Sequence, residues 1–233
     1  MDYGRFDIAQ YLSVLPLFDD LSSVQRQRLV DGCALQRFLP GERIFSVGDQ
    51  SQAFYVVVTG KVKLFVTAPS GQEKVIELIE PSHSFAEAFI FLDKPCMVHA
   101  QTLIDSLLLR VSKEVVVGEI RRDPQLAMNM LAGISRRLHG LIRDVEGYTL
   151  RSGMQRLIGY LLRDIEDGEP GDAMVPVTVE LRATKATIAS RLSLTPEYFS
   201  RVLHELEEAG FIQIDKREIR ILDVPGLAAY GSQ

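Results

Sequence analysis

A run of six apolar residues between positions 131 and 148 most constrains the fold of this 233-residue chain. Their spacings alternate between three and four residues, which is the a/d pattern of a coiled-coil seam. An amphipathic helix packed on its own domain gives a similar pattern over short runs. The unbroken alternation favours a helix that pairs with a second copy of the chain. The seam residues are Leu131, Ile134, Leu138, Leu141, Val145 and Tyr148.

The segment before this helix has the pattern of short strands. Several runs of β-forming residues follow position 35, and Gly41, Gly48, Gly60 and Gly71 punctuate them. Such strands with tight turns predict a small antiparallel β-roll or barrel. Residues 7–34 are predicted as short helices, one of them capped by a serine within Leu21-Ser22-Ser23-Val24-Gln25. The expected strands are Arg43–Val47, Phe54–Val58, Val62–Thr67, Lys74–Ile79 and Leu107–Val111.

The segment after the long helix has the pattern of a winged helix-turn-helix. One helix is predicted over Arg151–Glu166, ending in a loop at residues 167–172. Two more, Lys185–Leu194 and Pro196–Ala209, are separated by one short turn, with Thr195 as N-cap and proline at the first helical position. Two alternating runs then predict a hairpin, the wing, formed by Phe211–Ile214 and Glu218–Leu222.

The chain is therefore predicted to be an α+β protein in three parts. An N-terminal antiparallel β-roll sensor domain covers residues 1–122, a long dimerisation helix covers residues 123–149, and a winged helix-turn-helix domain covers residues 150–233. Asp123-Pro124 marks the start of the long helix. Residues 148–152 are the expected hinge between the two domains.

Composition limits the function classes. The formal net charge is −5, and residues 176–222 carry seven basic and seven acidic side chains, so gross charge gives no support for DNA binding. No apolar run approaches the roughly 20 residues of a membrane span, and the N-terminus does not read as a signal peptide. Cys33 and Cys96 suggest no disulfide framework. A cytoplasmic protein is expected, and the absence of enzyme motifs in a strand–helix context argues against an enzyme.

Three side chains outside the apolar stripe of the second predicted helix form the candidate base-reading surface. Glu197, Ser200 and Arg201 lie at i, i+3 and i+4, where a helix-turn-helix contacts base edges. An arginine there can bind guanine O6 and N7, and a glutamate can accept from cytosine N4. The alternative is a solvated face with an intrahelical Glu197–Arg201 ion pair. The candidate phosphate contacts are Lys185, Arg191, Lys216 and Arg217.

This order of parts resembles the CRP/FNR transcription regulators, whose β-roll is of the cyclic-nucleotide-binding type. The pattern Glu197…Ser200-Arg201 is similar to the FNR branch, which recognises TTGAT-N4-ATCAA-type palindromes. The resemblance implies a homodimer that binds double-stranded DNA and contacts RNA polymerase, as an activator, with Arg201 reading the G·C pair. Residues 71–74 and 85–93 look closest to the DNR-type regulators, which use haem to control denitrification genes in response to nitric oxide.

The sequence says least about the small molecule that the β-roll would bind. Cyclic AMP binding in the family needs an Arg-Ser pair after a Gly-Glu segment, whereas Ala86 stands at the glycine position and residues 95–98 hold no arginine. An iron–sulfur cluster normally needs four cysteines, and the chain has two. The remaining segment is apolar and suits haem or another hydrophobic ligand, or is simply core of the roll. Its candidate pocket residues are Phe85, Glu87, Phe89, Phe91 and Leu92.

Haem also needs axial ligands, and histidine is the usual one. His83, His99 and His139 are the candidates, and Cys96 could supply a thiolate. For each of them an ordinary surface or core role is the competing interpretation, and no other metal site is expected. DNR-type proteins have been proposed to use a histidine where this chain has Arg191, which departs from that pattern. A regulator that answers another hydrophobic small molecule, or none, therefore stays open.

Overall fold

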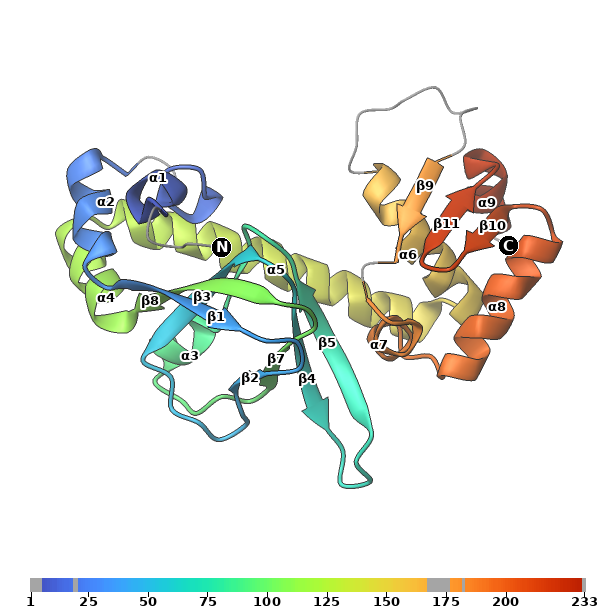
Figure 1. The fold of residues 1–233 in the computed structure, drawn as a ribbon, viewed down its shortest axis with the longest axis horizontal. Coiled ribbons are helices and arrows are strands. Elements are labelled where there is room, and N and C mark those ends of the chain that lie inside the picture. Colours follow the sequence, from blue (N-terminus) through green and yellow to red (C-terminus); the bar gives the residue numbers. More distant parts are fainter. Residues whose placement is uncertain (1–5, 19–20, 167–176, 182, 232–233) are drawn as a thin grey trace. The chain divides into compact units, whose positions relative to one another are not determined.

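The computed structural model describes residues 6–18, 21–166, 177–181 and 183–231 (Figure 1). The chain forms two compact units, an N-terminal unit of Met1–Gln72 with Ile76–Gly140 and a C-terminal unit of Glu73–Val75 with Leu141–Gln233. The loop predicted at residues 167–172 and the extreme N-terminus lie outside the described residues. Among the described helices, none is both long and apolar enough to cross a membrane.

The N-terminal unit is built on two four-stranded sheets, with strand orders β1-β8-β3-β6 and β2-β7-β4-β5. Strand β8 pairs antiparallel with both β1 and β3, and β4 pairs antiparallel with β7, which confirms the predicted roll. The strands are β1 Cys33–Phe38, β2 Arg43–Phe45, β3 Ala53–Thr59, β4 Val62–Thr67, β5 Glu73–Ile79, β6 Ser84–Phe85, β7 His99–Thr102 and β8 Ser106–Ser112, and the helices are α1 Ile8–Leu12, η2 Pro16–Phe18, α2 Ser23–Val30, α3 Glu87–Leu92 and α4 Lys113–Arg122.

The core of the roll lies between these sheets. Val56 on β3 pairs with Leu109 on β8, and both side chains are buried. Phe85 on β6 stacks on Tyr55, with ring centroids 5.5 Å apart, and Phe45 lies edge-on to Phe89 at 5.9 Å. Burying an aromatic side chain of this size contributes roughly 2–3 kcal/mol, so this aromatic cluster is a main source of the roll's stability.

Two helices flank the roll and are held to each other by a buried ion pair. The predicted serine cap of α2 is Ser22, and it forms a capping box with Gln25 that the sequence analysis did not identify. From α2 the guanidinium of Arg28 makes two hydrogen bonds, of 2.8 and 2.6 Å, to the fully buried Glu119 carboxylate on α4. These bonds hold the pKa of Glu119 below its usual value. The sequence analysis did not predict α4, although Ser112 stands at its N-cap position, Glu114 lies in its first turn and Arg121 and Arg122 lie in its last.

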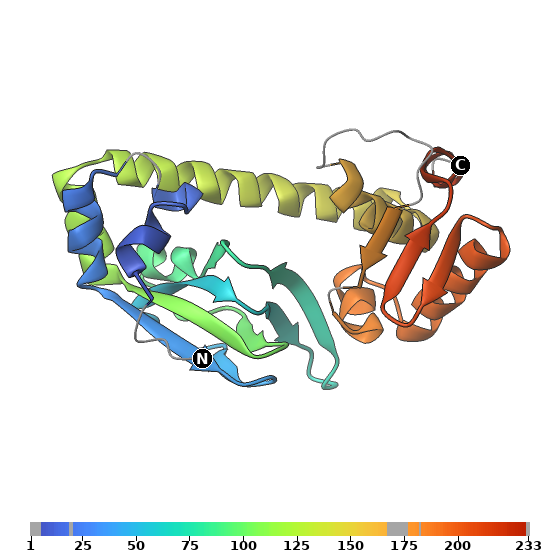
Figure 2. The same ribbon diagram turned by 45° about the horizontal axis from the view of Figure 1, so that its top comes forward.

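The long helix α5 spans Gln125–Leu150 without a break (Figure 2). Leu126 and Met130 near its start are buried against the roll. A stripe of large apolar side chains on the same helix is left exposed, each by 38–60 %. The members of this exposed stripe are Met128, Leu131, Ile134, Leu138, Ile142 and Val145.

The C-terminal unit has the predicted winged helix-turn-helix. Its three-stranded sheet has the order β10-β11-β9, and both pairings are antiparallel. Leu157, Ile188 and Leu203 meet in the core and are fully buried. The elements are α6 Gly153–Glu166, β9 Val177–Glu180, α7 Lys185–Arg191, α8 Pro196–Glu208, β10 Ile212–Asp215, β11 Glu218–Ile221 and α9 Val224–Tyr230.

Candidate nucleic-acid interface

Helix α8 begins where the sequence predicts. The Thr195 side chain accepts a hydrogen bond from the backbone N–H of Tyr198 at 3.2 Å, and Pro196 stands in the first turn, where its missing N–H costs nothing. Four apolar side chains then fix one face of the helix in the core, because they recur at helical spacing. These are Phe199, Val202, Leu203 and Leu206, all at most 1 % exposed.

Loss of this cap should loosen the first turn of α8. We expect Thr195→Ala to lower the local stability by about 1 kcal/mol, since one backbone donor loses its partner. Hydrogen exchange of the Tyr198 amide in the full chain would then be about fivefold faster, which is that free energy expressed as an equilibrium ratio. Thr195→Ser is the matched control, because it keeps the hydroxyl. Equal acceleration in both variants would show that the hydroxyl is not the capping group.

The turn between α7 and α8 is closed by backbone and side-chain bonds. Ser193 adopts a left-handed conformation with φ +56°, and the N–H of Leu194 bonds back to the carbonyl of Ala189 at 2.9 Å. The guanidinium of Arg156 on α6 donates to the carbonyls of Leu192 and Ser193. A cation at these carbonyls satisfies acceptors that the end of α7 leaves open. These bonds fix the conformation of the turn and with it the direction in which α8 leaves α7.

The outer face of α8 presents the predicted base-reading residues. Glu197 and Arg201 are exposed and Ser200 is half-buried. In the described part of the chain no ion pair joins Glu197 to Arg201; instead the Arg201 guanidinium lies over the Tyr198 ring, 4.8 Å from its centroid. Such a cation–π contact contributes about 0.5–1 kcal/mol at an exposed site and leaves the guanidinium N–H groups available to a base.

Tyr198 is a residue that the sequence analysis missed. Its ring lies against the backbone of Gly153, where an added Cβ would stand 2.4 Å from a ring carbon. Any side chain at Gly153 would therefore push Tyr198 away and disturb the surface beneath Arg201. The signal in the sequence was an aromatic residue three positions before the arginine, which shares a helix face with it.

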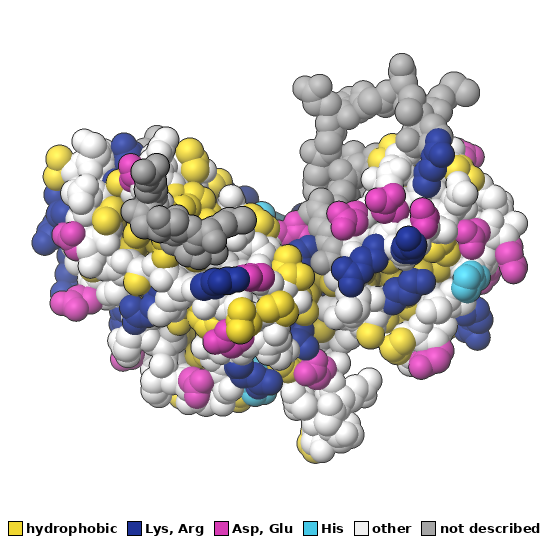
Figure 3. Space-filling model, in the orientation of Figure 1, with side chains coloured by type: hydrophobic (Ala, Val, Ile, Leu, Met, Phe, Trp, Pro, Cys, Tyr) yellow, Lys and Arg dark blue, Asp and Glu magenta, His cyan; other side chains and the backbone are white. Residues whose placement is uncertain are grey.

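The four candidate phosphate contacts do not have equivalent surroundings. Lys216 and Arg217 are exposed at the tip of the wing, and Lys185 is half-buried at the start of α7. Arg191 is different: its guanidinium is ion-paired with Asp144 and is only 13 % exposed. In Figure 3 basic and acidic side chains are interspersed on the visible face of the molecule. This agrees with the equal numbers of basic and acidic residues between positions 176 and 222.

The predicted seam and the exposed stripe of α5 share Leu131, Ile134, Leu138 and Val145. Leu141 is half-buried, and the hydroxyl of Tyr148 donates a hydrogen bond to the Arg191 carbonyl at 2.5 Å. Met128 and Ile142, which the sequence analysis did not place on the seam, complete the exposed stripe. The sequence could not separate Ile142 from Leu141, because the two apolar residues are adjacent. A straight helix also drifts from an exact heptad repeat, so the exposed face changes along its length.

The candidate effector residues do not gather around one cavity. Phe85 and Phe89 are buried in the aromatic cluster of the roll, whereas Phe91 and Leu92 are 42 % and 57 % exposed. Glu87 is buried, and its carboxylate lies 3.4 Å from the guanidinium of Arg137 on α5. Arg137 also donates to Glu77 at 2.7 Å, a pairing that the sequence did not indicate. Ala86 has φ +75°, which is a conformation that glycine adopts without strain.

None of the three candidate histidines is fully buried. His83 is exposed, with its ring bonded to the Pro81 carbonyl at 3.0 Å. His139 is exposed on α5. His99 is half-buried on β7, where Nδ1 accepts from the Val47 N–H at 3.2 Å and the ring packs on Phe65 at 5.1 Å. Among the described residues, no three histidine, cysteine or acidic side chains are grouped to hold a metal ion.

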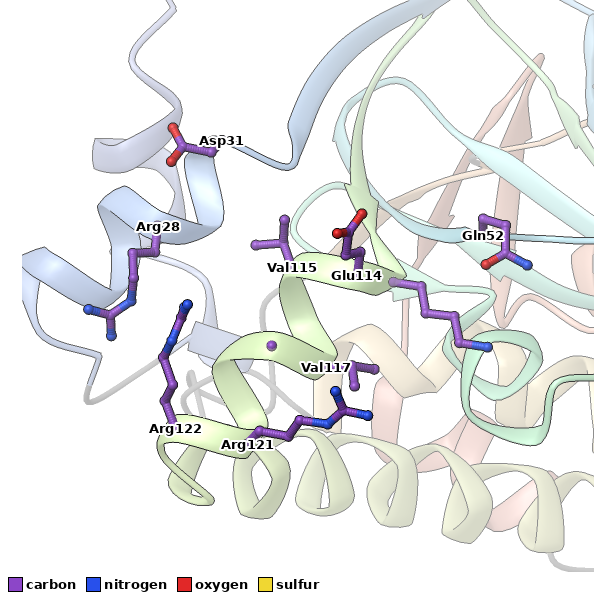
Figure 4. A pocket seen from close by; sticks show the side chains of 10 residues that line it. Arg28, Asp31, Gln52, Glu114, Val115, Val117, Arg121 and Arg122 are labelled. Carbon is purple, nitrogen blue, oxygen red and sulfur yellow. The ribbon is translucent and has the colours of Figure 1, made fainter.

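A cavity of about 690 Å³ in the N-terminal unit has a different lining (Figure 4). It lies beside α2 and α4 and is lined mainly by polar and charged side chains, among them Arg28, Gln52, Arg121 and Arg122. Arg28 and Arg122 both pair with Glu119, and Lys113 at its edge pairs with Asp93. Arg28 and Arg122 share that single carboxylate, and the polar lining does not suit an apolar ligand.

Comparison with known proteins places both units in one family. Residues 35–123 match the cyclic nucleotide-binding domain and residues 155–230 match the Crp-like helix-turn-helix domain. The chain is 27 % identical to the cyclic AMP receptor protein of Thermus thermophilus over 206 residues, covering 88 % of this chain and 92 % of that protein. It is 26 % identical to the global nitrogen regulator of Synechococcus elongatus over 226 residues, covering 95 % and 98 %.

A solved structure gives a stronger similarity. The crystal structure of DNR from Pseudomonas aeruginosa is 35 % identical to this chain and covers 97 % of it, the match covering 99 % of DNR, with a TM-score of 0.52. One of these relatives is a cyclic AMP receptor protein and another is a nitrogen regulator, so the comparison shows the family of this chain and not its effector. With a cyclic-nucleotide-binding-type roll, a long helix and a Crp-like helix-turn-helix, the chain belongs to the CRP/FNR family of transcription regulators.

Proposed function

We propose that this protein is a homodimeric regulator that reads an FNR-like DNA palindrome through α8. The observation that carries the proposal is the placement of Glu197 and Arg201. Both are exposed in the first turns of a capped helix whose opposite face is locked in the core. Arg201 is held over a tyrosine ring and has no acidic partner among the described residues, so its fork of donors is available to guanine O6 and N7.

The exposed stripe of α5 supports the dimer. Six large apolar side chains recur on one side of this helix with spacings of three and four residues, and water covers them in the single chain. Pairing with the same stripe of a second copy would bury them in a two-fold arrangement. Two recognition helices then face two half-sites about one helical turn apart, which accounts for a palindromic target. As a transcription activator, such a dimer would recruit RNA polymerase.

Binding to a duplex containing TTGAT-N4-ATCAA tests this function. We expect the full-length protein to bind it roughly a thousandfold or more tightly than a scrambled duplex at the same salt concentration, as specific regulators do. Fluorescence anisotropy with labelled duplexes measures both affinities. A duplex with the guanine of each half-site replaced by adenine is the sequence control. Equal affinity for the palindrome and the scrambled duplex would contradict the proposal.

A response to nitric oxide through haem, controlling denitrification genes, is the finer proposal. Its support is the resemblance to DNR-type regulators and the 35 % identity to DNR. The candidate side chains do not form a haem pocket in this conformation, because Phe85 and Phe89 are packed in the core. Glu87 moreover places a charged pair with Arg137 beside them. Haem, or any other apolar ligand at these residues, would require the rings to leave their present packing, which favours the alternative of a regulator that acts without ligand.

Titration of the purified protein with haemin distinguishes these readings. Haem sensing predicts a Soret band that saturates at one haem per chain, and His99→Ala or His83→Ala should shift its position if that ring is an axial ligand. His204→Ala, an exposed histidine in the C-terminal unit, is the matched control. Without a saturable band the haem proposal is wrong, while DNA binding by α8 is unaffected.

A further inference from the structure

Arg191 belongs to a compact cluster at the end of α5 rather than to the exposed face of the helix-turn-helix. Its guanidinium is ion-paired with Asp144 and donates a hydrogen bond to the Tyr148 hydroxyl at 2.5 Å. That hydroxyl in turn donates to the Arg191 carbonyl. Asp144 and Tyr148 are four residues apart on α5, so they share one face of the helix. Both belong to the C-terminal unit, together with α7 and α8.

The polar groups of this cluster bond to one another and are largely shielded from water. The Tyr148 hydroxyl is used both as donor and as acceptor, and burial raises the pKa of Tyr148, although the nearby Arg191 acts to lower it. Asp144 and Arg191 are 29 % and 13 % exposed, so solvent screens their attraction less than it does at the surface. The Arg191 carbonyl is among the last of α7, so the contact also fixes the end of that helix.

Residues 141–150, the part of α5 that belongs to the C-terminal unit, also carry part of the exposed stripe. Ile142 and Val145 are 56 % and 60 % exposed. At about 100° per residue, their face is turned roughly 110° about the helix axis from that of Asp144 and Tyr148. One short stretch of α5 therefore presents one side to the proposed partner copy and another side to α7. The contact therefore joins α7 to the part of the exposed stripe that lies in the C-terminal unit.

We propose that the contact of Arg191 with Asp144 and Tyr148 sets the spacing between half-sites that the dimer accepts. The inference rests on the proposed DNA-reading function. Each base pair added between half-sites moves the second one by about 3.4 Å and turns it by about 34° around the DNA axis. Two rigidly held recognition helices fit one spacing only, whereas helices released from α5 can follow several. Arg191 is thus a positioning residue and does not itself contact DNA.

The test compares duplexes whose half-sites are separated by three, four or five base pairs, and a duplex with a single half-site. We expect the wild type to prefer one spacing strongly. Asp144→Asn, which removes the charge and keeps the shape, should reduce that preference roughly tenfold while leaving single-half-site affinity unchanged. Glu146→Gln is the matched control, because Glu146 is an exposed carboxylate two positions along the same helix.

Charge exchange gives a second measurement. The double variant Asp144→Arg with Arg191→Asp should recover part of the spacing preference that each single variant loses. Arg191→Lys, which keeps the charge but not the fork, should fall between the wild type and Asp144→Asn. An unchanged spacing preference in Asp144→Asn and in Arg191→Lys would overturn the inference. A wild type that binds no palindrome at all would instead overturn the proposed function, so the two failures are distinguishable.

Discussion

Arg201→Ala is expected to abolish discrimination at the guanine of each half-site. The arginine would offer two N–H donors to guanine O6 and N7, and no other side chain on the exposed face of α8 can make that contact. A bidentate pair of this kind is worth about 1–3 kcal/mol, so the dimer should lose about 2–6 kcal/mol on a symmetric palindrome. Affinities for the native duplex and for one with the guanines replaced should become equal.

Two controls separate base reading from a general loss of positive charge. Arg163→Ala removes another exposed arginine that lies near a tyrosine ring, that of Tyr160 at 6.0 Å, from helix α6. It should leave the affinities for both duplexes as they are. The salt dependence of binding gives the second control, because a base contact leaves its slope nearly unchanged, whereas a lost phosphate contact lowers it by about one. A uniform loss on every sequence, with a shallower slope, would assign Arg201 to the phosphates.

Leu138→Glu is expected to convert the dimer into a monomer. Leu138 lies in the middle of the exposed stripe of α5 and is 56 % exposed in the single chain. A glutamate there would place two negative charges in the centre of the two-fold seam, where they repel each other in an apolar environment. A monomer engages a single half-site, so affinity for the palindrome should fall by roughly 10²- to 10⁴-fold, the usual gain from linked binding.

Sedimentation equilibrium measures the first effect and anisotropy the second. Ala132→Glu is the matched control: it adds the same charge to the same helix at an exposed position roughly 120° about the helix axis from Leu138. It should remain a dimer with normal affinity. If Leu138→Glu also stayed dimeric and bound the palindrome, the exposed stripe would not be the dimer seam. Retained affinity for a single half-site shows that the winged helix-turn-helix itself is intact.

The sequence alone was sufficient for the elements that depend on neighbours along the chain. Strand periodicity predicted the roll, and the structure confirms it through β3, β4 and β8. Thr195 and Pro196 predicted the start of α8 to the residue, because a cap and a first-turn proline act within three positions. Strands β1 and β7 were not predicted, since they are short and are held by pairing with strands distant in the sequence. Helix α4 was also not predicted, although its ends carry the usual acidic and basic residues.

The candidate site divides in the same way. Exposure of Glu197 and Arg201 followed from their spacing on a helix whose apolar face is unambiguous. The ion pair of Arg191 with Asp144 could not be predicted in this way, because Asp144 lies 47 positions away and on a different helix. Phe85 and Phe89 were equally compatible with a pocket lining and with a core, and only the packing of Phe45 and Tyr55 around them places them in the core.

What the sequence by itself determined about this protein is therefore the type and order of its elements and the face of α8 that stays exposed. These follow from periodicity, capping and spacing, which are local. The tertiary structure alone decided which charged groups meet: Arg137 with Glu77 and Glu87, and Arg191 with Asp144. The physical reason is that a partly buried charge must find an opposite charge wherever the fold brings one near, and that proximity is not recorded in the order of the residues.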